Sequence, residues 1–241
     1  MERIKRFLKS IKVFKNFWEY LTKKDFTLLE TRSGIKYFIR SKTADKGIIL
    51  EIFYDNAYLP KIEGFRIEKG DIVIDVGAQI GVFSILAAKK FKAKVISFEP
   101  LKENYDILLK NIKINGLKNI IPVRKAICKK NGRAKLYIDE TNTGGHSIFL
   151  NRDKYEIVDC ITLKDVFKEF DIKKCNFLKL DCEGCEYEVV LESPKEVLEK
   201  IDKISMEFHE HPKYSVKMLK EKLEECGFNI ILKNHMLYAW R

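Results

Sequence analysis

The hydrophobic positions after residue 70 fall into two alternating patterns. Short hydrophobic runs rich in β-branched residues are typical of buried strands, and they occur at residues 71–76, 94–99, 119–126, 176–181 and 202–208. Between these runs, hydrophobic residues spaced three and four apart predict helices at residues 80–90, 101–114, 162–170 and 214–225. Strands that alternate with helices predict an α/β fold, a Rossmann-like doubly wound sheet of mainly parallel strands. Two closing strands, near 228–233 and 236–240, have no helix between them, which predicts an antiparallel pair at the end.

The first 58 residues follow a different pattern. Residues 3–21 carry a hydrophobic stripe at helical spacing, formed by Ile4, Phe7, Leu8, Ile11, Phe14, Trp18 and Leu21. This amphipathic helix either packs on the main domain, contacts a membrane surface, or covers a bound acceptor. Residues 26–58 alternate and turn, which predicts two or three short strands in a small accessory β-layer. We therefore divide the chain into residues 1–50, with the helix and accessory strands, and residues 51–241, the main domain.

Positive charge is concentrated in the same N-terminal segment. The 241 residues have a formal net charge of +11, and residues 1–24 hold eight Lys or Arg against Glu2 and Glu19, which gives +6. The charge of the main domain is therefore small, and we expect no nucleic-acid partner. No hydrophobic run is long enough for a transmembrane helix, and the N-terminus lacks the pattern of a signal peptide. The six cysteines should then be reduced, which indicates a cytoplasmic protein, with membrane association through residues 3–21 as an open alternative.

A strand, a glycine turn and the start of a helix follow one another after residue 70, as in a nucleotide-binding βα unit. Gly77 and Gly81 bracket the turn, but Gln79 stands where a dinucleotide-binding turn has its second glycine. Asp75 lies near the end of this strand and Glu99 ends the next, at the sheet edge where such folds bind ligands. A carboxylate at the end of the second strand can accept hydrogen bonds from both hydroxyls of a ribose. The pattern indicates an adenosine-type ligand with little provision for a diphosphate.

Three segments of this region carry a family resemblance. They are Val-Ile-Asp-Val-Gly-Ala-Gln-Ile-Gly-Val-Phe at 73–83, Ser-Phe-Glu-Pro at 97–100 and Leu-Lys-Leu-Asp-Cys-Glu-Gly-Cys-Glu at 178–186. In sequence and order they resemble the FkbM family of class I S-adenosylmethionine-dependent methyltransferases, over about residues 50–210. The family usually has Asn in place of Gln79, and a small hydrophobic residue in place of a cysteine at 182 or 185. The resemblance implies seven strands with the last antiparallel, and S-adenosylmethionine as the cofactor.

The resemblance also implies which residues bind that cofactor. Gly77, Ala78 and Gly81 would let the turn approach it, and Asp75 would hold the methionine ammonium directly or through water. Glu99 would bind the ribose hydroxyls, and Asp181 would lie beside the sulfonium methyl. The full expected set is Asp75, Gly77, Ala78, Gln79, Gly81, Glu99, Pro100, Ala126 and Asp181.

A hydroxyl acceptor must lose its proton during methyl transfer, which requires a base. The candidates are Asp181, Glu207 and His209, because alternation along a strand puts Glu207 and His209 on one face near the same cleft. A divalent metal held by Asp181 with one or more of these residues is an open alternative, although we assign no metal ligand. In the third interpretation, Glu207 and His209 only fix the end of the strand.

We expect an O-methyltransferase that acts on a sugar, glycan, glycolipid or small-molecule hydroxyl. RNA methylation is an alternative prompted by the net charge, but the fourth strand lacks the Asn/Asp-Pro-Pro-Tyr motif for base amino groups. A non-catalytic module that binds S-adenosylmethionine is a further alternative. Cys182-x-x-Cys185 has no second such pair, which argues against a zinc or redox role. The polar loop 141–147, with His146, either contacts substrate or is a surface loop.

Overall fold

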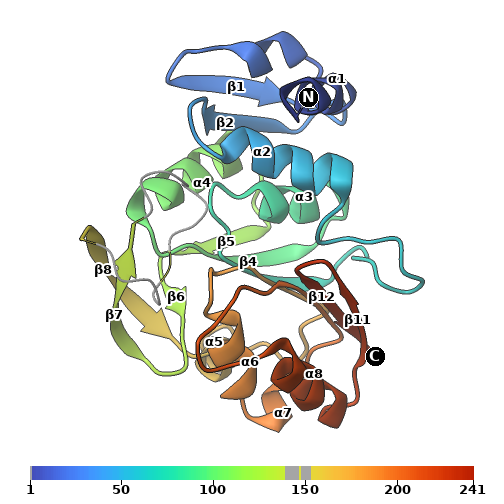
Figure 1. Cartoon of the computed structure of the whole chain (residues 1–241), viewed down its shortest axis with the longest axis vertical. Helices are drawn as coiled ribbons and strands as arrows, with labels where there is room; N and C mark the ends of the chain where they lie inside the picture. The colour runs from blue at the N-terminus through green and yellow to red at the C-terminus, as the bar shows by residue number, and fades with distance from the viewer. Residues whose placement is uncertain (1, 139–146, 148–152) are drawn as a thin grey trace.

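A central sheet of seven strands organises the protein, in the order β11-β12-β10-β9-β3-β4-β5 (Figure 1). The computed structural model describes residues 2–138, 147 and 153–241, so the predicted loop around His146 lies outside the described residues, except for Ser147. The strands are β3 (Ile72–Val76), β4 (Lys94–Phe98), β5 (Ile120–Val123), β9 (Phe177–Leu180), β10 (Lys203–Glu207), β11 (Asn229–Lys233) and β12 (Met236–Trp240). Strand β12 is antiparallel to both β10 and β11, while the other pairs are parallel. The predicted α/β sheet with an antiparallel last strand is confirmed.

Helices cover both faces of this sheet (Figure 1). On one face lie α3 (Val82–Lys90) and α4 (Lys102–Ile114), and on the other lie α5 (Leu163–Glu169), α6 (Glu186–Leu191), α7 (Lys195–Leu198) and α8 (Val216–Glu225). Successive side chains of a strand point to opposite faces, so Val73 packs in the cluster that includes Phe83 of α3, whereas Ile74 packs in the cluster that includes Val189 of α6. Burial on both faces explains why the strands are continuous hydrophobic runs.

Two smaller sheets flank the central one. Strands β6 (Ala126–Ile127), β7 (Gly132–Tyr137) and β8 (Tyr155–Ile161) form a three-stranded sheet in the order β6-β8-β7. Strands β1 (Phe26–Glu30) and β2 (Lys36–Arg40) form an antiparallel hairpin, the predicted accessory layer.

The N-terminal helix is shorter than the hydrophobic stripe predicts. Helix α1 covers Glu2–Val13, and a 3₁₀ helix, η1, follows at Phe17–Leu21. The break occurs because Asn16 bonds to the backbone of the hairpin, donating to the Leu28 carbonyl and accepting from the Glu30 N–H. Four stripe residues are therefore left exposed rather than buried, namely Ile4, Leu8, Trp18 and Leu21. None of the described helices is long and hydrophobic enough to span a membrane.

Of the two or three strands predicted within residues 26–58, the hairpin provides two, and the following segment is helical rather than a third strand. Helix α2 (Asp45–Leu50) continues into a π-helical turn, η2 (Glu51–Asp55). The buried Asp45 carboxylate accepts from the Arg40 backbone at 2.9 Å and from its guanidinium at 3.0 Å, which fixes the start of the helix. Burial of Ile49 and Ile52 on one side then outweighs their preference for strands. We call residues 2–55 the N-terminal unit; the division at residue 50 stays a prediction.

Candidate active site

A cavity of about 470 Å³ lies at the carboxyl ends of β3, β4, β9 and β10, and we call it the cofactor cavity. Its volume is within the range of about 300–1,000 Å³ that is typical of small-molecule sites. Most of the predicted site residues line it, namely Gly77, Ala78, Gln79, Glu99, Pro100, Ala126, Asp181 and Glu207. Asp75, Gly81 and His209 are not among its lining residues. The strand order thus brings together residues that lie up to 130 positions apart in the chain.

The glycine turn after β3 depends on two backbone positions that only glycine suits. Gly77 has φ +73°, and a Cβ there would lie 1.7 Å from the carbonyl oxygen of Asp181. Gly81 has φ +86°, and its Cβ would lie 2.3 Å from Cδ1 of Leu108 on α4. Gly77 therefore seats the turn against the end of β9, whereas Gly81 permits helix packing outside the cavity.

Gln79 connects the turn to two carboxylates. Its backbone N–H donates to Oε2 of Glu99 at 2.8 Å, and its side-chain Nε2 donates to Oδ1 of Asp45 at 3.0 Å. The amide side chain therefore points to the N-terminal unit, and the backbone supports the acidic residue at the end of β4.

Glu99 has the environment expected of a ribose-binding carboxylate. It is buried, and its Oε1 accepts from the Leu101 N–H at 2.9 Å. Burial raises the pKa of Glu99 to about 7, although the backbone hydrogen bonds lower it. Two ribose hydroxyls would supply the donors that such a buried carboxylate favours. Ile127 and Leu136 add hydrophobic lining beside Ala126, so these residues fit an adenosine-type ligand.

Asp75 lies behind the cavity wall and is fully buried. Its Oδ2 accepts from the Ser84 hydroxyl at 2.6 Å, and its Oδ1 is 3.3 Å from Nζ of Lys179. Asp75 does not line the cavity, and its predicted contact with the ligand ammonium, directly or through water, stays a prediction.

Lys179 is a site residue that sequence reasoning missed. It pairs in register with Asp75 on the neighbouring strand, and its Nζ donates to the Gly77 carbonyl at 2.7 Å. Nζ also lies 3.4 Å from Oδ2 of Asp181. Burial lowers the pKa of Lys179, but the charges of Asp75 and Asp181 outweigh this and raise it. A lysine within the buried run 177–180 was the available signal, since buried charges are normally paired.

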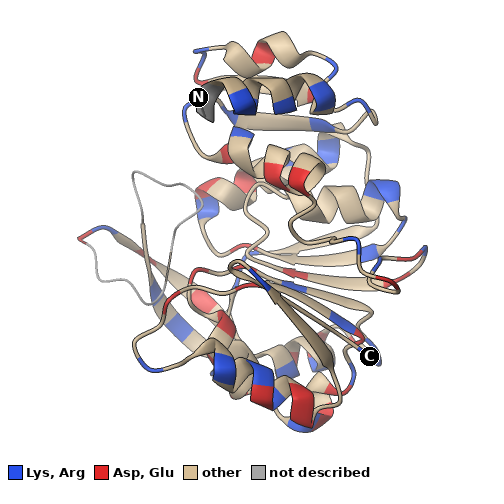
Figure 2. Cartoon of the chain, turned by 45° about the vertical axis from the view of Figure 1, so that its right-hand side comes forward, with Lys and Arg blue, Asp and Glu red and all other residues tan. Residues whose placement is uncertain are grey.

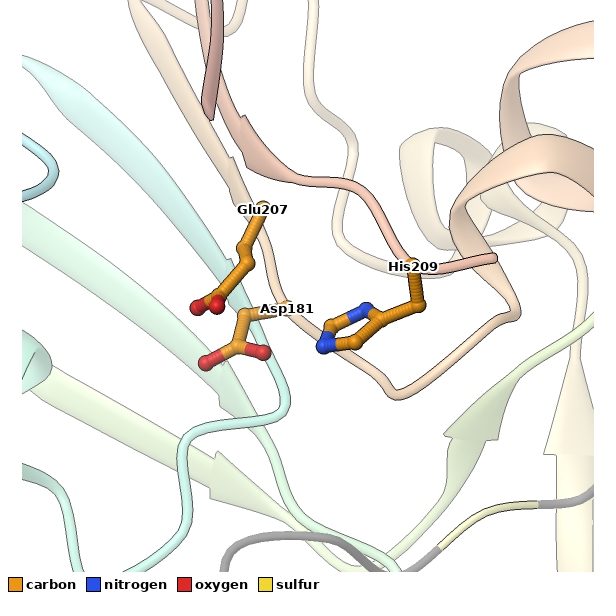
Figure 3. A group of neighbouring side chains, drawn as sticks. All are labelled: Asp181, Glu207 and His209. Carbon is orange, nitrogen blue, oxygen red and sulfur yellow. The ribbon is translucent and has the colours of Figure 1, made fainter. Parts of the chain in front are cut away.

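The carboxylates of Asp181 and Glu207 lie side by side, with the His209 ring nearby (Figure 3). The Tyr58 hydroxyl donates to Oδ2 of Asp181 at 2.7 Å and to Oε2 of Glu207 at 3.3 Å. Burial and the charge of Asp181 raise the pKa of Glu207. Glu51, on η2, lines the same cavity. Burial and the charges of Glu207 and Asp181 raise the pKa of Glu51 to about 7. Neither Tyr58 nor Glu51 carries a sequence motif, so both were missed.

His209 is held between two other carboxylates. Its Nδ1 lies 3.2 Å from Oε1 of Glu186, and its Nε2 lies 3.3 Å from Oε2 of Glu183. Burial lowers the pKa of His209, but the hydrogen bond and charge of Glu186 and the charge of Glu183 raise it to about 9. A largely protonated imidazole is a poor base at neutral pH, so the geometry favours the carboxylates for that role.

The same residues have donor atoms suited to a metal. Asp181, Glu207 and His209 each offer one ligand atom, and these atoms lie within 4.8 Å of one another. Carboxylate oxygens with an imidazole nitrogen suit several divalent metals. A cation here would replace the contacts with Tyr58 and Glu186, so the metal alternative stays open beside the base.

The structure joins Cys182 and Cys185 by a disulfide, with Cα atoms 5.4 Å apart. This pairing differs from the expectation that all six cysteines are reduced. Both residues line the cofactor cavity next to Asp181, so the bond braces the turn between β9 and α6.

Comparisons with known proteins identify the family of the chain. The sequence profile of the methyltransferase FkbM domain matches residues 75–230, which is more than half of the chain. Methyltransferase sdnD from Sordaria araneosa is 25% identical over 230 residues, covering 81% of this chain and 86% of that protein. Methyltransferase 1 from Beauveria bassiana is 23% identical over 223 residues, covering 79% and 88%. Among solved structures, a putative transferase from Pyrococcus horikoshii has a TM-score of 0.49 and 15% identity, covering 89% of this chain and 71% of that one. The chain belongs to the FkbM methyltransferase family and is an S-adenosylmethionine-dependent enzyme.

Proposed function

We propose that this enzyme methylates a hydroxyl oxygen of a sugar, a glycan or a small molecule. The observation that supports the proposal is the Tyr58 hydroxyl, whose single proton lies within reach of both Asp181, at 2.7 Å, and Glu207, at 3.3 Å. These two carboxylates can accept hydrogen bonds from a substrate hydroxyl in the same way. Burial and the charge of Asp181 raise the pKa of Glu207, which makes its carboxylate a stronger proton acceptor than an ordinary glutamate.

Each part of the cavity has a proposed role. S-adenosylmethionine, when bound, supplies a methyl group activated by its sulfonium. The turn at Gly77 and the carboxylate of Glu99 hold the nucleoside part of the cofactor. Asp181 lies between that part and Glu207, and Lys179 orients its carboxylate. Glu207 takes the proton of the methyl acceptor.

The proposal is tested by transfer of labelled methyl from S-adenosylmethionine into glycan, lipid, RNA and small-molecule pools. We expect Glu207→Gln to lower kcat about 10²- to 10³-fold while the cofactor dissociation constant changes less than about threefold. Glu210→Gln, at an exposed position three residues further on, is the matched control. Near-normal kcat in both Glu207→Gln and Asp181→Asn, with normal cofactor binding, contradicts the proposed base. Label found in RNA alone supports the RNA alternative.

A chelator separates the base from the metal alternative. Proton transfer to Glu207 needs no metal, so we expect enzyme dialysed against EDTA to keep its full rate. If EDTA instead removes activity, Mg²⁺ or Mn²⁺ restores it, and His209→Ala prevents that restoration, then Asp181, Glu207 and His209 hold a cation.

We also infer peripheral contact with anionic membranes for this otherwise cytoplasmic enzyme. Ile4 and Leu8 lie one turn apart on α1 and are 66% and 54% exposed, and Trp18 on η1 is 68% exposed. Lysine and arginine residues are spaced along the same helix (Figure 2). Such a hydrophobic and basic surface suits an anionic lipid interface. Cosedimentation with phosphatidylserine vesicles should be lost in Ile4→Ser/Leu8→Ser. Equal binding to neutral vesicles, or none to either, contradicts the contact.

A further inference from the structure

A second cavity adjoins the cofactor cavity, and we call it the basic groove. It has a volume of about 890 Å³ and lies between α1, the segment 55–62 and the turn that joins β11 to β12. Four residues line both cavities, namely Arg6, Gly47, Glu51 and Glu207. The two cavities are therefore continuous, and a molecule in the groove meets the proposed base Glu207 at its inner end.

Three lysines on the groove wall have no ionic partner. Lys5, Lys61 and Lys233 line the groove and make no ion pair with any residue that the structure describes. Lys9, on the same wall, has its Nζ 2.6 Å from Asp55 and is already neutralised. An isolated surface lysine is normally only solvated. Here three lysines from separate segments converge on one concave surface, where their fields add and attract an anion.

The groove also has a hydrophobic part. Leu50, Pro60, Ile62 and Met236 contribute side chains to its lining. Small-molecule sites typically combine such hydrophobic surface with a few polar groups that fix the orientation of the ligand. The groove therefore offers a surface for a ring or a chain, cations for an anionic group, and a carboxylate at the junction with the cofactor cavity.

We propose that the basic groove binds the methyl acceptor, and that this acceptor is a small molecule or sugar bearing a phosphate or carboxylate. The proposal rests on the hydroxyl methylation proposed above. Lys5, Lys61 and Lys233 attract the anionic group, and the hydrophobic part contacts the rest of the molecule. The hydroxyl to be methylated then lies near Glu207. Because the lysines are exposed, their attraction weakens as ionic strength rises.

The decisive variant is Lys5→Gln/Lys61→Gln/Lys233→Gln, assayed with labelled S-adenosylmethionine and the small-molecule pool retained by an anion exchanger. We expect the apparent KM for this pool to rise about tenfold while kcat at saturation stays within about twofold. Lys69→Gln/Lys94→Gln/Lys118→Gln is the matched control, because it removes the same charge near the amino ends of β3, β4 and β5. The control should keep the wild-type KM and cofactor affinity.

A binding measurement separates failure of the groove from failure of the proposed function. Inorganic phosphate, followed by calorimetry, should bind wild-type protein and the control triple variant, and should bind the groove variant at least about fivefold more weakly. Equal KM and equal phosphate binding in the two triple variants overturn the groove proposal while leaving methyl transfer intact. Label confined to uncharged molecules or to RNA also overturns it. Normal phosphate binding without transfer to any hydroxyl overturns the proposed function instead.

Discussion

The cofactor cavity and the basic groove share four lining residues but are built in different ways. The cofactor cavity is formed by short segments that each follow a strand of the central sheet, and backbone contacts such as that of Gly77 with Asp181 fix it. Much of the groove wall comes from α1, the segment 55–62 and the hairpin β11–β12, and its lysines Lys5, Lys61 and Lys233 are exposed. We therefore expect substitutions in the cofactor cavity to lower both cofactor affinity and the stability of the fold. Substitutions in the basic groove should change only the affinity for the methyl acceptor.

The largest expected effect is at Gly77. In Gly77→Ala the Cβ meets the Asp181 carbonyl, so either the turn or the end of β9 must move. We expect cofactor affinity to fall more than about 100-fold and the free energy of unfolding to fall by about 3 kcal/mol or more. Calorimetry and denaturant unfolding measure the two. Gly70→Ala, at φ +89° with open space around it, is the control and should cost about 1 kcal/mol. Equal effects of the two substitutions would show that the contact with the Asp181 backbone does not fix the turn at Gly77.

The second largest effect is expected for Glu99→Gln, which should lower cofactor affinity but raise the free energy of unfolding above neutral pH. The carboxyl of Glu99 has an ordinary pKa of 4.5 and a pKa of about 7 in the folded protein, so folding favours its protonated form. The stability from that proton is complete below pH 4.5 and is lost as pH rises through about 7. Glu99→Gln removes this pH-dependent loss, so the stability of the variant relative to wild type should increase by about 2.5 kcal/mol between pH 5 and pH 8. Cofactor affinity should fall about tenfold, because an amide is a weaker acceptor for ribose hydroxyls.

Urea unfolding at several pH values measures the stability of the Glu99 variant. Glu225→Gln, at the exposed end of α8, is the control and should follow wild type at every pH. A Glu99→Gln curve parallel to wild type would show that Glu99 does not carry this pH dependence.

The smallest expected effect is at Tyr58, near the junction of the two cavities. Its hydrogen bond lowers the pKa of Glu207, so Tyr58→Phe should move the rising limb of the pH–rate profile to higher pH. We expect kcat at pH 7 to fall about three- to tenfold, with cofactor affinity unchanged. Tyr105→Phe, whose hydroxyl donates to the Pro122 carbonyl on the other side of the fold, is the control. A lower cofactor affinity with an unmoved profile would place Tyr58 with the cofactor cavity alone.

The same contrast explains what could be predicted from the sequence. The turn at Gly77 and the carboxylate of Glu99 belong to short motifs, because each follows directly from a strand and its end. Lys179 was within reach, since a charge in a buried strand needs a partner on the next one. Tyr58 and the groove lysines could not be predicted from the sequence, because only the packing of distant segments brings them to the site. A third strand within residues 26–58 is absent for the same reason, since tertiary burial makes the segment Asp45–Asp55 helical.

The contact between Gly77 and Asp181 also bears on how the enzyme can diversify. A side chain at position 77 would displace the backbone at Asp181, so the glycine of the cofactor turn must be inherited together with the backbone path at the end of β9. The groove lysines touch neither residue, and each can be exchanged while methyl donation is preserved. New acceptor preferences can therefore be selected one lysine at a time, through variants that all remain functional.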